Sequence, residues 1–343
     1  MNSNTTYSLK FILIGLLLLL FILINLSLGS VDIPFKSILQ TLTGHNTTKE
    51  SWQYIILHYR LPKTITAILV GSGLSICGLL MQTLFRNPLA GPFVLGISSG
   101  ASLGVAILVL GISAFSGSIV GLAFSNIGLA IAASIGSFIV LSAVMLAAKK
   151  IKNTMSILII GLMFGSFTAA IISVLAYFSS ADQLQQYVFW TFGSLGNLGW
   201  SEILVLCILY LISIGLLITI LKPLNSLLLG ENYAVSLGVN LKRTRNTTLI
   251  ITGILTGAIT AFSGPIAFIG LAVPHLTKLL IKSSNHKTLV PAVAIIGAIV
   301  MLISDTIAQL PNSEYTLPIN AVTSLFGAPI VIWLLVRKRK ISY

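Results

Sequence analysis

Charged residues are scarce in this sequence, and acidic residues are the scarcest of them. Only 8% of the 343 residues are charged, and only seven are Asp or Glu. Hydrophobic residues make up 56% of the chain, and the mean hydropathy is +1.01. A surface that faces water needs far more charge than this. The composition therefore excludes an ordinary soluble protein and predicts an integral membrane protein.

Cysteine is also rare, since the chain has only two. Cys77 and Cys207 both fall in apolar stretches, where a small thiol packs readily. Two isolated cysteines indicate neither a disulfide framework nor a metal site. We therefore expect no metal and no other cofactor to be bound by this chain.

Motifs for catalysis are missing as well. Ionisable groups are costly in hydrocarbon, so a proton or sodium relay should be visible as clustered carboxylates, and no such pair occurs at helical spacing. No phosphate-binding loop of the Gly-x-x-x-x-Gly-Lys-Ser/Thr type occurs either. The chain is not expected to be an enzyme, and any ATP would be hydrolysed by another subunit. An ion-coupled secondary transporter stays open as the alternative, because backbone carbonyls can also coordinate sodium.

Long apolar segments are what the sequence does contain. A helix needs about 20 apolar residues to cross roughly 30 Å of hydrocarbon. The candidate spans are 9–28, 64–84, 93–112, 119–147, 155–178, 201–221, 247–263, 267–283, 289–310 and 320–336. They predict an all-α fold of about ten transmembrane helices, in a single domain that takes up residues 1–343.

The Lys and Arg residues divide unevenly between the two sides of such a bundle. If the N-terminus is inside, ten spans place both termini inside, and sixteen of the twenty cations fall in inside segments. Only Lys36, Lys49, Arg60 and Lys63 lie outside. This distribution follows the positive-inside rule. The net charge of +13 is thus explained by an inner surface that faces anionic lipid, and nucleic-acid binding is not expected.

Three polar segments interrupt the spans. Residues 29–63 and 179–201 are expected outside, the second with a short helix at the membrane surface. The largest inside loop, 222–246, is expected to form two short helices that end at Gly230 and Gly238, because glycine adopts the left-handed C-terminal conformation without steric cost. The loop leaves an apolar surface that needs lipid or a partner protein.

Similar dipeptides open two of the spans. Gly91-Pro92 opens the third span on the inside, and Gly264-Pro265 opens the eighth on the outside. This pair favours two inverted halves, spans two to five and seven to ten, an arrangement common in transporters. Leu61-Pro62 and Leu317-Pro318 both lie outside and do not follow that symmetry.

Four longer motifs follow one another from residue 60 to residue 336. They are Arg60-Leu-Pro-Lys through Gln82 and Arg86-Asn-Pro-Leu to Ala101, then Leu229-Gly-Glu231 through Ser236-Leu-Gly238, then Gly264-Pro-Ile through Pro-His275, and finally Leu317-Pro-Ile through Gly327-Ala-Pro-Ile. Together they resemble the FecCD family, the permease subunits of ATP-binding-cassette importers for iron–siderophore complexes, haem and cobalamin. The resemblance covers most of the chain.

The resemblance implies partners and a location in the bacterial plasma membrane. They are a second copy of the chain or a paralogous permease, two cytoplasmic ATPase subunits that bind ATP and Mg, and an extracytoplasmic substrate-binding protein. The resemblance assigns ATPase coupling to the 222–246 loop. The coupling residues are Gly230, Glu231, Ala234, Leu237 and Gly238.

The resemblance also assigns docking of the binding protein to Arg60 and Lys63. Lysine at 63 keeps the charge but lacks the bidentate fork of arginine. Two further family positions, an arginine and a glutamate, are Gln309 and Thr316 in this chain.

A cytoplasmic gate is assigned by the resemblance to Asn87, Pro88, Leu89 and Thr154, although a proline at a turn is also ordinary punctuation. His275 raises the hypothesis of a haem ligand, because haem is one family cargo. The same Pro-His occurs in family members for other cargo, so a structural role is favoured. The sequence does not choose between the possible chelates.

Overall fold

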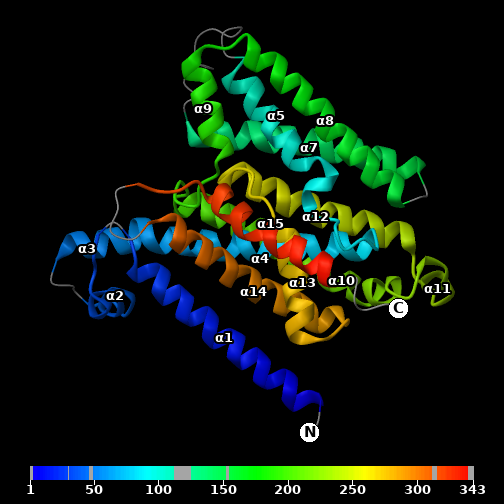
Figure 1. The fold of residues 1–343 in the computed structure, drawn as a ribbon, viewed down its shortest axis with the longest axis horizontal. Coiled ribbons are helices and arrows are strands. Elements are labelled where there is room, and N and C mark those ends of the chain that lie inside the picture. Colours follow the sequence, from blue (N-terminus) through cyan, green and yellow to red (C-terminus); the bar gives the residue numbers. More distant parts are fainter. Residues whose placement is uncertain are drawn as a thin grey trace. The chain divides into compact units, whose positions relative to one another are not determined.

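The computed structural model describes residues 3–29, 31–45, 49–111, 125–151, 154–310 and 315–338. Throughout these ranges the regular structure is helical and no strand occurs (Figure 1). The first helices are α1 (Ser3–Ser27), α2 (Phe35–Leu42), α3 (Glu50–Ile55), the π-helical turn η1 (Ile56–Arg60), α4 (Leu61–Leu84), the 3₁₀ turn η2 (Pro92–Leu95), α5 (Ile97–Val109) and α7 (Asn126–Lys150). They are followed by α8 (Thr154–Tyr177), α9 (Ala181–Thr191), α10 (Trp200–Leu227), α11 (Glu231–Ser236), α12 (Leu241–Ser263), α13 (Ile269–Ile281), α14 (His286–Ala308) and α15 (Ile319–Lys338). The all-α prediction is confirmed.

Seven helices of the described ranges are long and apolar enough to cross a membrane. They are Tyr7–Ser27, Glu50–Leu84, Asn126–Lys150, Met155–Tyr177, Trp200–Leu227, Leu241–Ser263 and His286–Ala308. Three shorter apolar helices, Ile97–Val109, Ile269–Ile281 and Ile319–Trp333, coincide with the remaining predicted spans. The chain is therefore a multi-pass membrane protein, as predicted, and the count of ten spans stays a prediction. The residues around 112–124, where the third and fourth predicted spans meet, lie outside the described ranges.

The 222–246 loop differs from the prediction of two short helices. The residues expected to form the first of them continue α10, which runs through Pro223 to Leu227. Pro223 removes one backbone hydrogen bond, but the leucine-rich run on both sides keeps the chain helical. Gly230, with φ of 111°, stands at the start of the one separate short helix, α11, and Gly238 ends that helix as predicted.

The helices pack into two compact units, and each is described by itself. The first unit comprises Met1–Ile76, Ser194–Cys207 and Ala267–Tyr343, and the second comprises Cys77–Gly193 and Ile208–Ile266. In the first unit, α14 packs against α1, α13 and α15. In the second, α5 packs against α7, α8, α9 and α12 around a cluster of small buried side chains that includes Ala101, Val105 and Ala133.

The two predicted halves of the chain share their local geometry. Each Gly-Pro pair leads to a residue in the left-handed region, Gly96 with φ of 71° or Phe268 with φ of 67°. Each of these residues is the N-cap of a helix of 13 residues, α5 or α13. α5 packs against α7 and α8, and α13 packs in the same order against α14 and α15. The predicted repeat is therefore visible in the fold.

The first helix of each half packs against the later helices of the other half. α12, which opens the second half, packs against α5 and α7 of the first half. The N-terminal part of α4, which opens the first half, packs against α14 of the second half, where a Cβ on Gly71 would overlap the carbonyl oxygen of Gly297. Neither half therefore packs as an independent body.

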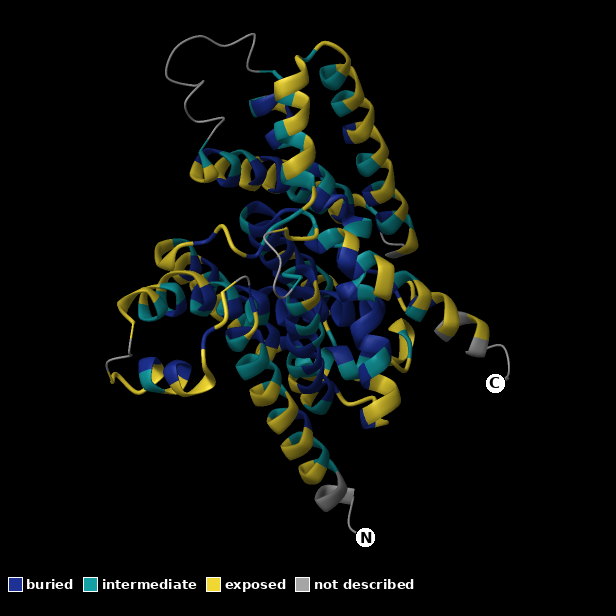
Figure 2. Ribbon diagram, turned by 60° about the vertical axis from the view of Figure 1, so that its left-hand side comes forward, coloured by how far each residue is buried: buried dark blue, intermediate teal, exposed yellow. Residues whose placement is uncertain are grey.

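The apolar helices differ widely in how much of their surface is exposed. In the apolar windows of α1 and α8, 17% of the residues are buried, against 83% in the Glu50–Leu84 window. Figure 2 shows exposed residues along the helix that begins at the N-terminus. Side chains such as Leu13, Leu16 and Leu20 are exposed on α1, as expected of a surface that faces lipid.

Candidate functional site

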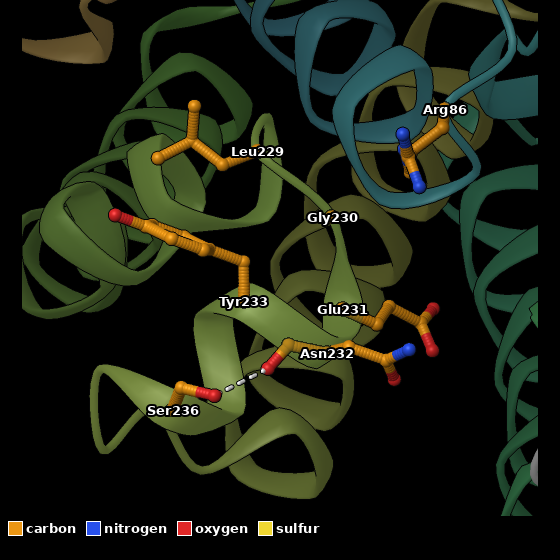
Figure 3. A pocket seen from close by; sticks show the side chains of 7 residues that line it. All are labelled: Arg86, Leu229, Gly230, Glu231, Asn232, Tyr233 and Ser236. Carbon is orange, nitrogen blue, oxygen red and sulfur yellow. Dashed lines mark hydrogen bonds between the residues drawn. The ribbon is translucent and has the colours of Figure 1, made fainter.

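An open pocket of about 710 Å³ lies beside α11 in the second unit. Its lining residues are Arg86, Leu229, Gly230, Glu231, Asn232, Tyr233 and Ser236. Figure 3 shows Leu229 and Tyr233 extending to one side of this segment and Glu231 to the other. Two of the predicted coupling residues, Gly230 and Glu231, therefore line one pocket.

The other predicted coupling residues fix and flank α11. Ala234 is its one fully buried side chain, while Leu237 is exposed. The backbone N–H of Val239 donates to Ala234 O at 3.0 Å, and that of Gly238 donates to Val235 O at 2.9 Å. These two bonds and the φ of 80° at Gly238 form a Schellman cap. The cap therefore fixes the C-terminal end of α11, next to the exposed side chain of Leu237.

Substitution of Gly238 by alanine is expected to loosen α11. A Cβ at this position meets no atom within 4 Å, so the φ of 80° is the only obstacle. A left-handed residue with a Cβ costs about 1–2 kcal/mol, and Gly238→Asn should cost less because asparagine tolerates this region. Hydrogen–deuterium exchange of α11 should be fastest in Gly238→Ala. Equal exchange in Gly238→Ala and the unsubstituted chain would contradict this account of the cap.

Arg86, which lines the same pocket, directly precedes the turn of the predicted gate. It follows α4 with φ of 46°, and its Nη1 lies 3.8 Å from the position that a Cβ on Gly230 would take. In the turn that follows, Asn87 Oδ1 accepts from the backbone N–H of Leu89 at 2.9 Å, and Leu89 is exposed. Pro88 lies inside this turn. For Thr154, the structure gives the place of its backbone at the start of α8.

Arg60 lies at the end of α1 in the first unit. It is buried, and its Nη1 donates to Leu26 O at 2.7 Å and to Ser27 O at 2.8 Å, while its Nη2 donates to Val31 O. The last carbonyls of a helix lack intrahelical donors and carry the negative end of the helix dipole. Arg60 therefore joins the start of α4 to the end of α1, and its docking role stays a prediction.

Lys63 pairs with a buried carboxylate. Its Nζ lies 3.1 Å from Asp305 Oδ1. Asp305 Oδ2 accepts from Asn25 Nδ2 at 2.9 Å and from Gln309 Nε2 at 2.7 Å. Thr64 Oγ1 then donates to Asn25 Oδ1 at 2.8 Å. This set, named here the Asp305 network, connects α1, α4 and α14 in the first unit.

A pocket of about 330 Å³ lies beside the Asp305 network. Its lining includes Arg60, Lys63, Gln309 and Thr316. The first two are the predicted docking residues, and the last two stand where the family has an arginine and a glutamate. The structure brings these four positions together. Asn25 and Tyr59 are among the other residues that line it. Sequence analysis missed the partner of Lys63, although Asp305 lies well inside the span predicted at 289–310.

His275 lies buried in α13, directly after Pro274. Among the described residues, no group of three or more His, Cys, Asp and Glu side chains could hold a metal ion. Haem iron needs only one or two axial ligands from the protein, so the haem-ligand hypothesis and the structural role of His275 both stay predictions.

The fold and these sites define a class of protein. An all-helical multi-pass bundle with two similar halves and an exposed apolar connecting helix is typical of a membrane permease. The model of the FecCD transport family matches residues 17–337, so the chain belongs to that family.

Named relatives agree with this assignment. The chain is 36% identical to the hemin transport system permease protein HmuU of Yersinia pestis over 330 residues, which are 96% of both chains. It is 35% identical to the vitamin B12 import system permease protein BtuC of Citrobacter koseri over 289 residues, 84% of both chains. A solved inward-facing conformation of a metal-chelate type ABC transporter matches with a TM-score of 0.82 and 30% identity, covering 96% of this chain and 99% of the other.

Proposed function

We propose that this chain is the transmembrane permease subunit of an ATP-binding-cassette importer in the bacterial plasma membrane, with both termini on the cytoplasmic side. Its cargo would be a metal chelate of the iron–siderophore, haem or cobalamin type. The observation that carries the proposal is the match to a hemin permease along 96% of both chains. Because the match covers nearly all the helices, the proposal does not depend on one motif alone.

ATPase coupling is proposed for α11 and the residues beside it. Leu229, Tyr233, Val235 and Leu237 are all exposed on this short segment. A cytoplasmic surface with four large apolar side chains needs a partner, and a short helix that enters a groove is a common mode of protein recognition. The partner would be an ATPase that holds ATP and Mg. Arg86 would then relay a movement of α11 to the turn at Asn87–Leu89.

Docking of a substrate-binding protein is proposed at the pocket beside the Asp305 network. The side chain of Lys63 is 23% exposed, so an acidic side chain of the binding protein could approach its ammonium group from outside. Gln309 and Thr316 supply neutral hydrogen-bonding groups around it. A second copy of the chain is proposed to cover part of α8, where exposed small residues such as Ala169, Ala170 and Ser173 allow close helix approach.

The proposal is tested by ATP hydrolysis in lipid nanodiscs. The chain is co-purified with its ATPase, and candidate binding proteins loaded with haem, ferric siderophore or cobalamin are added in turn. Stimulation by one loaded protein is expected and would identify the cargo. A chain that transports a chelate without any ATPase, driven by a proton or sodium gradient, would instead support the secondary transporter.

Replacement of Leu237 by aspartate tests the coupling role separately. A buried apolar anchor at an interface contributes about 2 kcal/mol, or roughly 30-fold in affinity, and a carboxylate there adds a desolvation cost. We expect loss of ATPase co-purification and of uptake, with normal insertion of the permease. Lys242→Ala, also exposed and one loop away, is the control. Full uptake by Leu237→Asp would refute this coupling role.

A further inference from the structure

α2 is fixed at the level where two membrane helices end. Its buried Ile38 packs with Leu26 of α1, Ile33 and Ile56, and all four side chains are buried. Leu26 lies at the end of the Tyr7–Ser27 span, and Ile56 lies early in the Glu50–Leu84 span. Figure 1 shows α2 beside this end of α1. α2 therefore cannot extend far from the membrane boundary.

The opposite face of α2 is apolar and exposed. Phe35, Leu39 and Leu42 are 48%, 43% and 43% exposed. They are spaced i, i+4 and i+7, so they form one stripe along the helix. Lys36 is exposed beside the stripe. Three large exposed apolar side chains lie together on a helix of only eight residues. Such a patch indicates contact with lipid or with another protein.

The surroundings of α2 resemble the boundary of a bilayer. Leu28 and Val31, which join α1 to α2, are exposed and continue the apolar surface of α1. Tyr54 and Tyr59 are also exposed, and Lys49 lies 4.9 Å from the centroid of the Trp52 ring. Tyrosine and tryptophan are enriched at membrane interfaces, where a ring can meet both apolar and polar groups.

We propose that α2 is an interfacial helix whose Phe35–Leu39–Leu42 stripe inserts into the outer leaflet of the bilayer, while Lys36 meets the lipid phosphates. The occupant is lipid because the stripe continues the apolar face of α1 at a fixed depth. α2 then anchors the end of α1, and with it the wall of the pocket beside the Asp305 network, which includes Val31. The choice of the outer leaflet rests on the proposed orientation of the termini, whereas insertion of the stripe depends on membrane placement alone and does not require the importer function.

Spin labelling of the full chain in lipid nanodiscs tests the proposal. Cys207→Ser removes the partly exposed thiol, and Cys77 is buried. Leu39→Cys and, as the matched control, Gln40→Cys on the polar flank are then labelled one at a time. An interfacial helix buries its apolar face about 5–10 Å into the headgroup and acyl boundary. The label at 39 should therefore be several-fold more accessible to oxygen, relative to a water-soluble nickel complex, than the label at 40.

Two results would overturn the proposal. Equal access of the nickel complex to positions 39 and 40 would place the stripe in water. Protection of position 39 from both reagents, with dipolar broadening between labels, would show a second copy of the chain on the stripe. Normal elution of the labelled proteins as inserted particles distinguishes both results from misfolding.

Discussion

A single methyl group at Gly71 is expected to prevent α4 and α14 from packing. A Cβ there would overlap the carbonyl oxygen of Gly297 and lie 2.6 Å from Met301 Cβ. The first of these atoms belongs to the backbone, so no rotamer change relieves the clash and the two helices must separate. Overpacking costs about 1–3 kcal/mol when side chains can adjust, and a backbone clash between two transmembrane helices should cost at least the upper value. Gly71→Ala should therefore yield little folded protein.

Gly15→Ala is the matched control for Gly71→Ala. Gly15 also lies in a transmembrane helix of the first unit, and a Cβ there meets no atom within 4 Å. Size-exclusion chromatography of both variants in mild detergent gives the folded fraction. A monodisperse Gly71→Ala protein with the thermal stability of Gly15→Ala would show that α4 and α14 do not approach as closely as described.

The spans could be predicted because the signal for a transmembrane helix is local. A run of apolar residues specifies a helix wherever the chain goes, since lipid leaves the backbone no other way to satisfy its hydrogen bonds. The predicted ends of the spans were less accurate next to glycine and proline residues. The span predicted at 93–112 yields α5 only from Ile97, because Gly91 and Pro92 lead into a 3₁₀ turn and a left-handed Gly96. The span predicted at 201–221 was too short instead, since α10 passes through Pro223 and ends at Leu227.

The positions of the candidate docking site could be predicted from the sequence, but their contact partners could not. Its positions could be named from motif resemblance, and four of them do line one pocket. Their partners could not be named, because Arg60 contacts carbonyls at the end of α1 and Lys63 contacts Asp305 on α14. Those contacts depend on how distant helices pack. A cation near a helix start looks the same in a sequence whether it faces a partner protein or caps a neighbouring helix.

Removal of Asp305 is expected to destabilise the first unit. Asp305→Ala would leave Lys63 without its ion pair and Gln309 Nε2 without this acceptor, while Asn25 Nδ2 would keep its bond to Thr306 Oγ1 at 3.1 Å. Breaking one side of a buried ion pair costs about 3–5 kcal/mol. Lys63 is 23% exposed, so water partly screens the remaining charge, and a loss of about 2–3 kcal/mol is the expected result. The measurement is the fraction that elutes as folded protein after heating.

The double variant Asp305→Ala, Lys63→Met separates the charge from the packing. It removes the stranded ammonium group together with the carboxylate, and such replacement of a buried pair by apolar groups is often close to neutral. The double variant should therefore be more stable than Asp305→Ala alone, even though it carries one more substitution. If both variants unfold at the same temperature, the loss comes from the amide contacts of Asn25 and Gln309. If Asp305→Ala unfolds with the unsubstituted chain, the Asp305 network does not hold α1, α4 and α14 together.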